Sequence, residues 1–94
     1  MGGRSKRSRA EIVLDILEAL TRGPQPPTRL ATAANLPYDR LAAILGDLER
    51  AGVVRVESLE GRTRVVSLTR KGLTLYSELS RLRRLIRDLG LDIL

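Results

Sequence analysis

Hydrophobic side chains recur at helical spacing in four stretches of this 94-residue chain, and two short runs are rich in β-branched residues. The most regular of the shorter stretches is 38–51, in which Leu41, Leu45 and Leu48 lie three or four positions apart. This spacing places the three leucines on one face of an α-helix. Pro37 suits the first turn of that helix, because the N–H that proline lacks would have no partner there. The pattern therefore predicts a helix over residues 38–51.

A shorter helix is predicted directly before it, over residues 28–34, with Leu30, Ala31 and Ala34 on its apolar face. Only residues 35–37 separate the two helices. Two helices joined by so tight a turn form a helix-turn-helix, whose second helix, the recognition helix, can enter the major groove of DNA. A helical hairpin used only for packing has the same pattern. This stretch alone leaves both interpretations open.

A third helix is predicted over residues 10–21. Its apolar stripe consists of Ile12, Val13, Ile16, Leu17 and Leu20. Ser8 and Glu11 have the spacing of a capping box, in which each side chain accepts a hydrogen bond from the backbone of the other residue. The outer face is acidic, with Glu11, Asp15 and Glu18. Because DNA would repel that face, we expect this helix to lie behind the DNA-binding surface.

The two β-rich runs, 53–58 and 63–68, follow the helix-turn-helix. Gly52 is placed to end the preceding helix, and the link over residues 59–62 contains the turn-forming Gly61, so the runs predict a β-hairpin. Its charged residues are Arg55, Arg62 and Arg64, with Glu57 and Glu60 between them. These arginines could contact DNA or could simply be solvated strand and turn residues.

The longest predicted helix runs from Thr69 to about Leu89. Apolar residues recur along it at alternating spacings of four and three, at Leu75, Leu79, Leu82, Ile86, Leu89 and Ile93. This is the seam of a coiled coil, although Gly90 is a place where the helix could end before Ile93. Leu73, Tyr76 and Leu85 could cover the domain's own core, and the whole stripe could pack within the chain. We favour a homodimer, because the first helix and the hairpin are too small to cover a stripe about 28 Å long at 1.5 Å per residue.

Composition narrows the chemistry of the protein. The sequence contains no cysteine and no histidine, which excludes disulfides, Cys/His zinc sites and any mechanism that needs a thiol or an imidazole. It also lacks a glycine-rich phosphate loop and paired carboxylates at metal-ligand spacing. We therefore expect no enzymatic activity, no cofactor and no metal. No apolar run is long enough to span a membrane, and a cytoplasmic, nucleoid-associated protein is expected.

Charge favours a polyanionic partner, since the formal net charge is +6. Four of these charges lie in the polar tail formed by residues 1–9, which we expect to be a disordered basic arm. The rest of the chain has thirteen basic and eleven acidic residues, a net charge of only +2. Because Tyr38 and Tyr76 are the only aromatic residues, stacking on single strands is disfavoured and duplex DNA is the expected partner.

Three helices followed by a two-stranded ribbon form the winged helix-turn-helix arrangement. We expect an α+β fold that is mainly α, with a small β-hairpin as the wing and a long C-terminal dimerisation helix. The predicted divisions are a basic arm over 1–9, a winged helix-turn-helix domain over 10–68 and a coiled-coil helix over 69–94.

Parts of the sequence also resemble a known family. The residues Thr28-Arg29-Leu30, Ala34-Asn35-Leu36-Pro37-Tyr38 and Leu41 resemble the helix-turn-helix of small archaeal winged-helix DNA-binding proteins, closest to the crenarchaeal ten-kilodalton chromatin protein family. Leu68-Thr69-Arg70-Lys71-Gly72 resembles the segment that leads from the wing into the last helix there, although this segment recurs in many bacterial winged-helix regulators. The resemblance implies a DNA-binding homodimer joined by an antiparallel coiled coil of the final helices.

The candidate DNA-binding surface combines the arm, the supporting helix, the recognition helix and the wing. Its residues are Lys6, Arg7, Arg9, Thr28, Arg29, Tyr38, Arg40, Ala43, Arg62, Thr63 and Arg64. The candidate dimer interface consists of Leu75, Leu79, Leu82, Ile86, Leu89 and Ile93. Three functions are open: a transcriptional regulator, an architectural chromatin protein with little sequence preference, and a winged helix used only for protein interaction. The regulator is slightly favoured because a pre-formed recognition helix is typical of that class, whereas the mixed charge of residues 38–50 favours the architectural protein.

Overall fold

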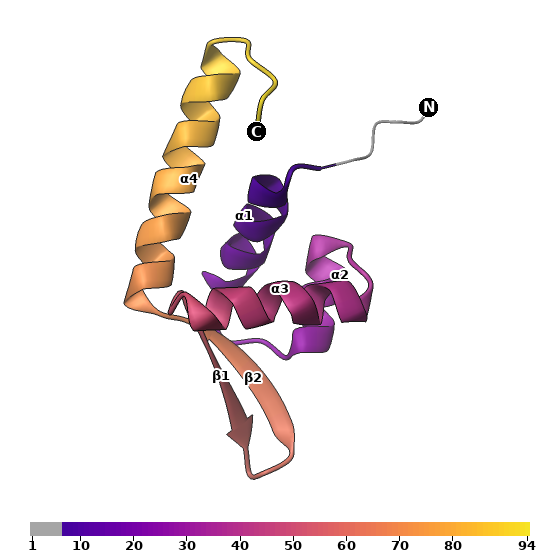
Figure 1. The fold of residues 1–94 in the computed structure, drawn as a ribbon. Coiled ribbons are helices and arrows are strands. Elements are labelled where there is room, and N and C mark those ends of the chain that lie inside the picture. Colours follow the sequence, from indigo (N-terminus) through magenta and orange to yellow (C-terminus); the bar gives the residue numbers. More distant parts are fainter. Residues whose placement is uncertain (1–6) are drawn as a thin grey trace.

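The computed structural model describes residues 7–94 of the chain. Its elements are α1 (Arg9–Leu20), α2 (Pro27–Ala34), α3 (Tyr38–Arg50), β1 (Val54–Leu59), β2 (Thr63–Leu68) and α4 (Arg70–Asp88). The first three helices pack together, the hairpin projects from the C-terminal end of α3, and α4 leaves that end in the opposite direction (Figure 1). The order of elements is the predicted one, and the fold is a winged helix-turn-helix.

Helix α1 begins with the capping box that the sequence predicts. The Glu11 N–H donates to Ser8 Oγ at 3.1 Å, and the Ser8 N–H donates to Glu11 Oε1 at 3.1 Å. The helix starts at Arg9, one residue earlier than expected, so Arg9 belongs to the folded domain. Leu14 is fully buried although it lies outside the predicted apolar stripe. Helix α1 contacts α2, α4 and β2, so more than one of its faces is covered.

The turn between α2 and α3 depends on Asn35, which takes the left-handed conformation with φ 57° and ends α2. The Leu36 N–H then donates to the Ala31 carbonyl at 2.9 Å. Pro37 is the N-cap of α3 and so precedes the first helical residue instead of occupying it. Helix α3 buries Leu41, Ile44, Leu45 and Leu48 against the core, which confirms the predicted apolar face.

The hairpin pairs β1 with β2 in antiparallel register, with Val56 opposite Val66. Glu60 and Gly61 both have positive φ, at 53° and 71°, as the tight turn of a hairpin requires. Val66 is fully buried and also pairs with Gln25 on its other side. The two backbone hydrogen bonds of this bridge measure 3.0 Å and 2.8 Å. They fasten the segment before α2 to the wing, which the sequence pattern does not indicate.

A compact junction joins the end of α3, the root of the wing and the start of α4. Thr69 caps α4 by accepting from the Gly72 N–H at 3.0 Å, and its hydroxyl donates to the Gly52 carbonyl at 2.6 Å. The Thr69 N–H donates to the Val53 carbonyl at 3.2 Å. Gly72 is buried so close to this carbonyl that a Cβ at position 72 would overlap its oxygen. Only glycine therefore fits at this contact without movement of the backbone.

Helix α4 is covered along only part of its apolar stripe. Leu75 and Tyr76 pack against the core, whereas Leu82 and Leu89 are 47% and 63% exposed. Leu85 is 54% exposed and Leu73 is 50% exposed, so the alternative in which they cover the core is wrong for these two residues and holds only for Tyr76. The helix ends at Asp88, Leu89 is its C-cap, and Gly90 follows with φ 76°. Ile93 therefore lies beyond the helix, and its placement on the helical seam is also wrong.

Two substitutions of helical glycines should change stability in opposite directions. Gly72→Ala should lower the free energy of unfolding by about 2 kcal/mol or more, because the added methyl overlaps the Val53 carbonyl oxygen. Gly46→Ala is the matched control: its Cβ would meet Arg50 Nη1 at 3.5 Å, an ordinary contact. It should raise stability by about 0.5–1 kcal/mol. Urea unfolding measures both values, and a neutral Gly72→Ala would contradict the junction described.

Candidate nucleic-acid interface

The outer face of α3 is accessible along its whole length. Opposite the buried leucines lie residues at helical spacing, namely Asp39, Ala43, Gly46 and Arg50. Ala43 and Gly46 carry little or no side chain, so the helix backbone can approach another surface closely there. Tyr38, 43% exposed, and Arg40, also exposed, stand in the first turn. This face has the shape of a recognition helix, with a narrow centre and charged residues at its edges.

The start of α2 supplies a second part of the interface. Thr28 and Arg29 are exposed in its first turn, which Pro27 begins. The N–H groups of a first helical turn lack carbonyl partners within the helix and favour anions. Arg29 borders an open cleft of about 550 Å³ together with Arg22, Pro24, Gln25 and Pro26. Arg22 is not among the candidates from the sequence, because its closeness to Arg29 depends on the fold of residues 21–27.

The wing supplies the third part. Arg62 lies in the turn, and Thr63 and Arg64 open β2; all three side chains are exposed. Arg64 pairs with Ser58 and so lies on the same face of the hairpin as Val56 and Val66, which face the core. Because the hairpin projects beyond the core at this point, that face becomes accessible. Arg55 lies on the opposite face of the ribbon.

The N-terminal arginines are engaged within the protein. Arg7 donates to Asp15 Oδ2 at 2.6 Å and to the Ala34 carbonyl at 2.5 Å, and so fastens the segment before α1 to the end of α2. Arg9 donates to Asp47 Oδ2 at 2.7 Å. The expectation of a wholly free basic arm over residues 1–9 thus does not describe Arg7 and Arg9. Lys6, the remaining candidate of that arm, lies outside the described residues.

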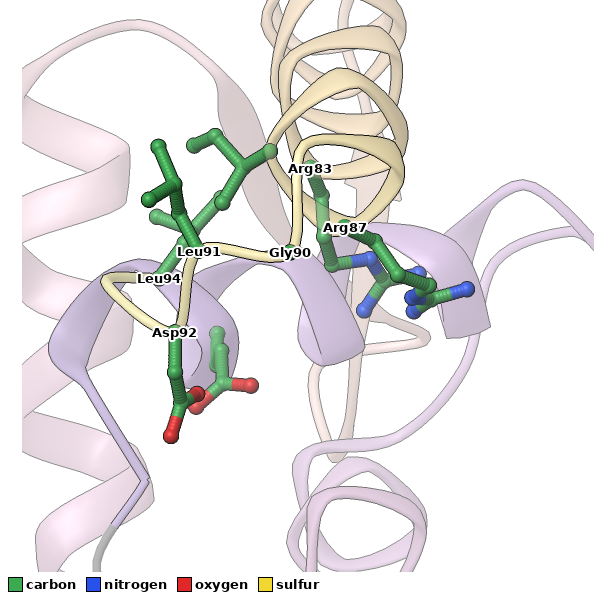
Figure 2. A pocket seen from close by; sticks show the side chains of 8 residues that line it. Arg83, Arg87, Gly90, Leu91, Asp92 and Leu94 are labelled. Carbon is green, nitrogen blue, oxygen red and sulfur yellow. The ribbon is translucent and has the colours of Figure 1, made fainter.

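Two further hollows lie on α4. One is an apolar groove of about 500 Å³, lined by Leu75, Glu78, Leu79, Arg81, Leu82 and Leu85. The other, of about 320 Å³, lies where the C-terminal segment turns back beside Glu11. Figure 2 shows Arg83 and Arg87 extending from α4 to one side of Gly90, and Leu91 and Leu94 to the other. The lining of this second hollow combines acidic and basic residues with leucines. The hollow lies on α4, apart from the recognition helix.

Three further findings concern metal ions, membranes and buried charge. Among residues 7–94, no group of three or more aspartates and glutamates is placed to hold a metal ion. No helix in the same range is both long and apolar enough to cross a membrane. Every buried residue among 7–94 is apolar, and no charged residue in that range is buried.

The chain belongs to the winged helix-turn-helix family, whose model matches residues 6–87. No curated protein sequence matches it significantly. Among solved structures, it is similar to Sso10a-2, a DNA-binding protein from Sulfolobus solfataricus, with a TM-score of 0.80 and 21% identity. That alignment covers 89% of this chain and 86% of the other.

Two transcriptional regulators are also similar in fold. BldR from Sulfolobus solfataricus matches with a TM-score of 0.76 and 24% identity, over 88% of this chain and 62% of BldR. A MarR-family regulator from Silicibacter pomeroyi matches with a TM-score of 0.73 and 26% identity, over 84% of this chain and 55% of that protein. This chain therefore spans less than two thirds of either regulator but most of Sso10a-2.

Proposed function

We propose that this protein binds double-stranded DNA and acts as a homodimeric transcriptional regulator on chromosomal DNA in the cytoplasm. The observation that carries the proposal is the accessible face of α3, bordered by exposed arginines on α2 and on the wing. Family membership supports it, as does the description of Sso10a-2 as DNA-binding and of BldR as a transcriptional regulator.

Each part of the interface has its own role in this proposal. Helix α3 enters the major groove with Tyr38, Arg40 and Ala43 toward the bases, and Arg40 is the candidate for a guanine contact. The start of α2 holds a phosphate through Thr28 and Arg29. The wing residues Arg62, Thr63 and Arg64 lie on phosphates or in the adjacent minor groove. Lys6 is a further candidate for a phosphate contact, whereas Arg7 and Arg9 join only by exchanging their carboxylate partners for phosphates.

An architectural DNA protein is the second candidate function. Acidic residues stand beside the arginines of α3, with Asp39, Asp47 and Glu49 against Arg40 and Arg50. A helix of such mixed charge is a weak source of tight base-specific binding. The resemblance of residues 28–41 to the crenarchaeal chromatin proteins also supports this candidate. A winged helix that binds only proteins is disfavoured by the exposed arginines of the wing.

The apolar groove on α4 is the proposed dimer interface. Leu75, Leu79 and Ile86 are half-buried by their own chain, while Leu82 and Leu89 remain exposed. Leu85 lines the same groove and joins the interface in place of Ile93. Each leucine fully buried by a partner contributes about 1.5–3 kcal/mol. The antiparallel direction of the pair rests on the family resemblance.

Selection from a random duplex pool tests the regulator against the architectural protein. A regulator should enrich a motif and prefer it over random DNA by about a thousandfold. Arg40→Ala should then cost about 1–3 kcal/mol of that preference. The double variant Arg62→Ala/Arg64→Ala should instead weaken binding to all duplexes alike, because phosphate contacts carry no base information.

The control is Arg84→Ala/Arg87→Ala, which changes the net charge equally but on α4. It should leave affinity within about a factor of two of wild type. A pool that enriches no motif, with tight binding to every duplex, would favour the architectural function. Equal losses for the wing and α4 variants would remove the wing from the interface.

Sedimentation analysis of matched variants tests the dimer. Leu82→Glu should dissociate it, because the new carboxylate would have to be desolvated in the interface. Leu73→Glu is the control, since Leu73 has nearly the same exposure, 50% against 47%, but lies outside the groove. It should remain dimeric. A wild-type protein that sediments as a monomer at high micromolar concentration would exclude the dimer.

A further inference from the structure

One carboxylate on the recognition helix binds two arginines at once. Asp47 Oδ2 accepts from Arg9 Nη2 at 2.7 Å, and Asp47 Oδ1 accepts from Arg50 Nη2. Arg9 is the first residue of α1 and Arg50 is the last residue of α3. The three side chains are 62%, 51% and 75% exposed for Arg9, Asp47 and Arg50 respectively. The cluster therefore lies at the surface, where α1 and α3 meet.

The position of this cluster relates it to DNA binding. Arg50 continues the line of outer-face residues that includes Ala43 and Gly46, the centre of the proposed groove-facing surface. Asp47 lies one turn earlier, at the edge of that line. DNA phosphates flank any helix that enters the groove. They would therefore approach the guanidinium groups of Arg9 and Arg50, which are bound to Asp47.

We propose that Asp47 acts as an internal counter-ion that competes with DNA phosphates for Arg9 and Arg50. This inference rests on the proposed DNA-binding function. Exposed ion pairs contribute little to stability, so the fold does not require Asp47. A phosphate oxygen is an equivalent acceptor for an arginine. Each arginine that stays bound to Asp47 therefore leaves one DNA phosphate without its contact, and the counterions at that phosphate are not released.

The consequence is a lower affinity for DNA of any sequence. Unselective binding depends on neutralised phosphates, whereas discrimination depends on contacts to base edges. By keeping two arginines from phosphates, Asp47 reduces unselective binding and leaves the contacts to base edges unchanged. Specific and random duplexes lose the same phosphate contacts, so the ratio of their affinities is unchanged, but less of the protein is held on random DNA at a given concentration. Without Asp47, the same face would resemble that of a protein that coats DNA.

The test measures binding of the full chain to a random-sequence duplex by fluorescence anisotropy over a range of salt concentrations. Asp47→Asn should bind about three- to tenfold more tightly at low salt, as expected for exposed ion pairs. The slope of log K against log salt should become steeper by about 1–2 per subunit, at about 0.9 for each added phosphate contact. Asp47→Glu, which keeps the charge, should bind like wild type.

Asp88→Asn is the matched control for net charge, because Asp88 is exposed at the end of α4. It should change affinity less than about twofold and leave the salt slope unchanged. Asp47→Asn should also lose most of its effect in an Arg9→Gln/Arg50→Gln background. Thermal melting checks that the variants are folded, and Asp47→Ser removes the same charge if Asp47→Asn does not fold.

Three outcomes would overturn the proposal while leaving DNA binding intact. These are an unchanged slope in Asp47→Asn, an equal gain in Asp88→Asn, and a gain that persists in full without the two arginines. Absence of any DNA binding by the wild type at low salt would overturn the proposed function itself, and this inference with it.

Discussion

The contact between Gly72 and the Val53 carbonyl fixes the start of α4 against the start of the wing. Val53 directly precedes β1, the first strand of the wing, and Gly72 lies in the first turn of α4. Thr69 completes the junction by bonding to Gly52 and Val53. Gly72 has no room for a side chain against the Val53 carbonyl, and Thr69 bonds to Gly52 and Val53, so the end of α3, the start of the wing and the start of α4 are held together. A partner bound along α4 would therefore fix the separation and direction of two recognition helices.

The charges on the domain are arranged more by pairing than by number. Arg7 and Arg9 are bound to Asp15 and Asp47, whereas the arginines of the wing project from the hairpin. The Arg9–Asp47 pair links α1 to α3, and Arg7 links the segment before α1 to the end of α2 through the Ala34 carbonyl. In the proposed interface, the surface that remains for DNA is modest in charge, and the protein's own carboxylates would limit its affinity. Selectivity then has to come from the exposed face of α3.

Much of the fold is predictable because its signals are local. The capping box of Ser8 and Glu11, the glycine after α3 and the leucine spacing of α3 are short-range patterns that each select one backbone conformation. The hairpin follows from Gly61 in the same way. Features that depend on tertiary contacts are not predictable from the same patterns. Gln25 pairs with β2 only because the fold brings it there, and Leu14 is buried although it lies outside the apolar stripe of α1.

The residues of the candidate site also differ in whether local sequence patterns or tertiary contacts determine their surroundings. The candidate residues on α2, α3 and the wing follow from periodicity and turn position, and all of them are exposed in the structure. Arg7 and Arg9 look like members of a free basic tail, because their partners Asp15 and Asp47 lie 8 and 38 positions away in sequence. Ile93 continues the seam by counting alone, but Gly90 turns the chain out of the helix first. Leu85 enters the groove because α1 covers one side of α4 and leaves the other side open.

The central claim is that duplex DNA binds across α3, the start of α2 and the wing. Amide chemical-shift mapping of the full chain with a short duplex at low salt tests it most directly. The expected shifts centre on Thr28 and Arg29, on the exposed face of α3, and on residues 62–64. Shifts confined to the acidic face of α1 or to α4, with α3 and the wing unchanged, would contradict the account.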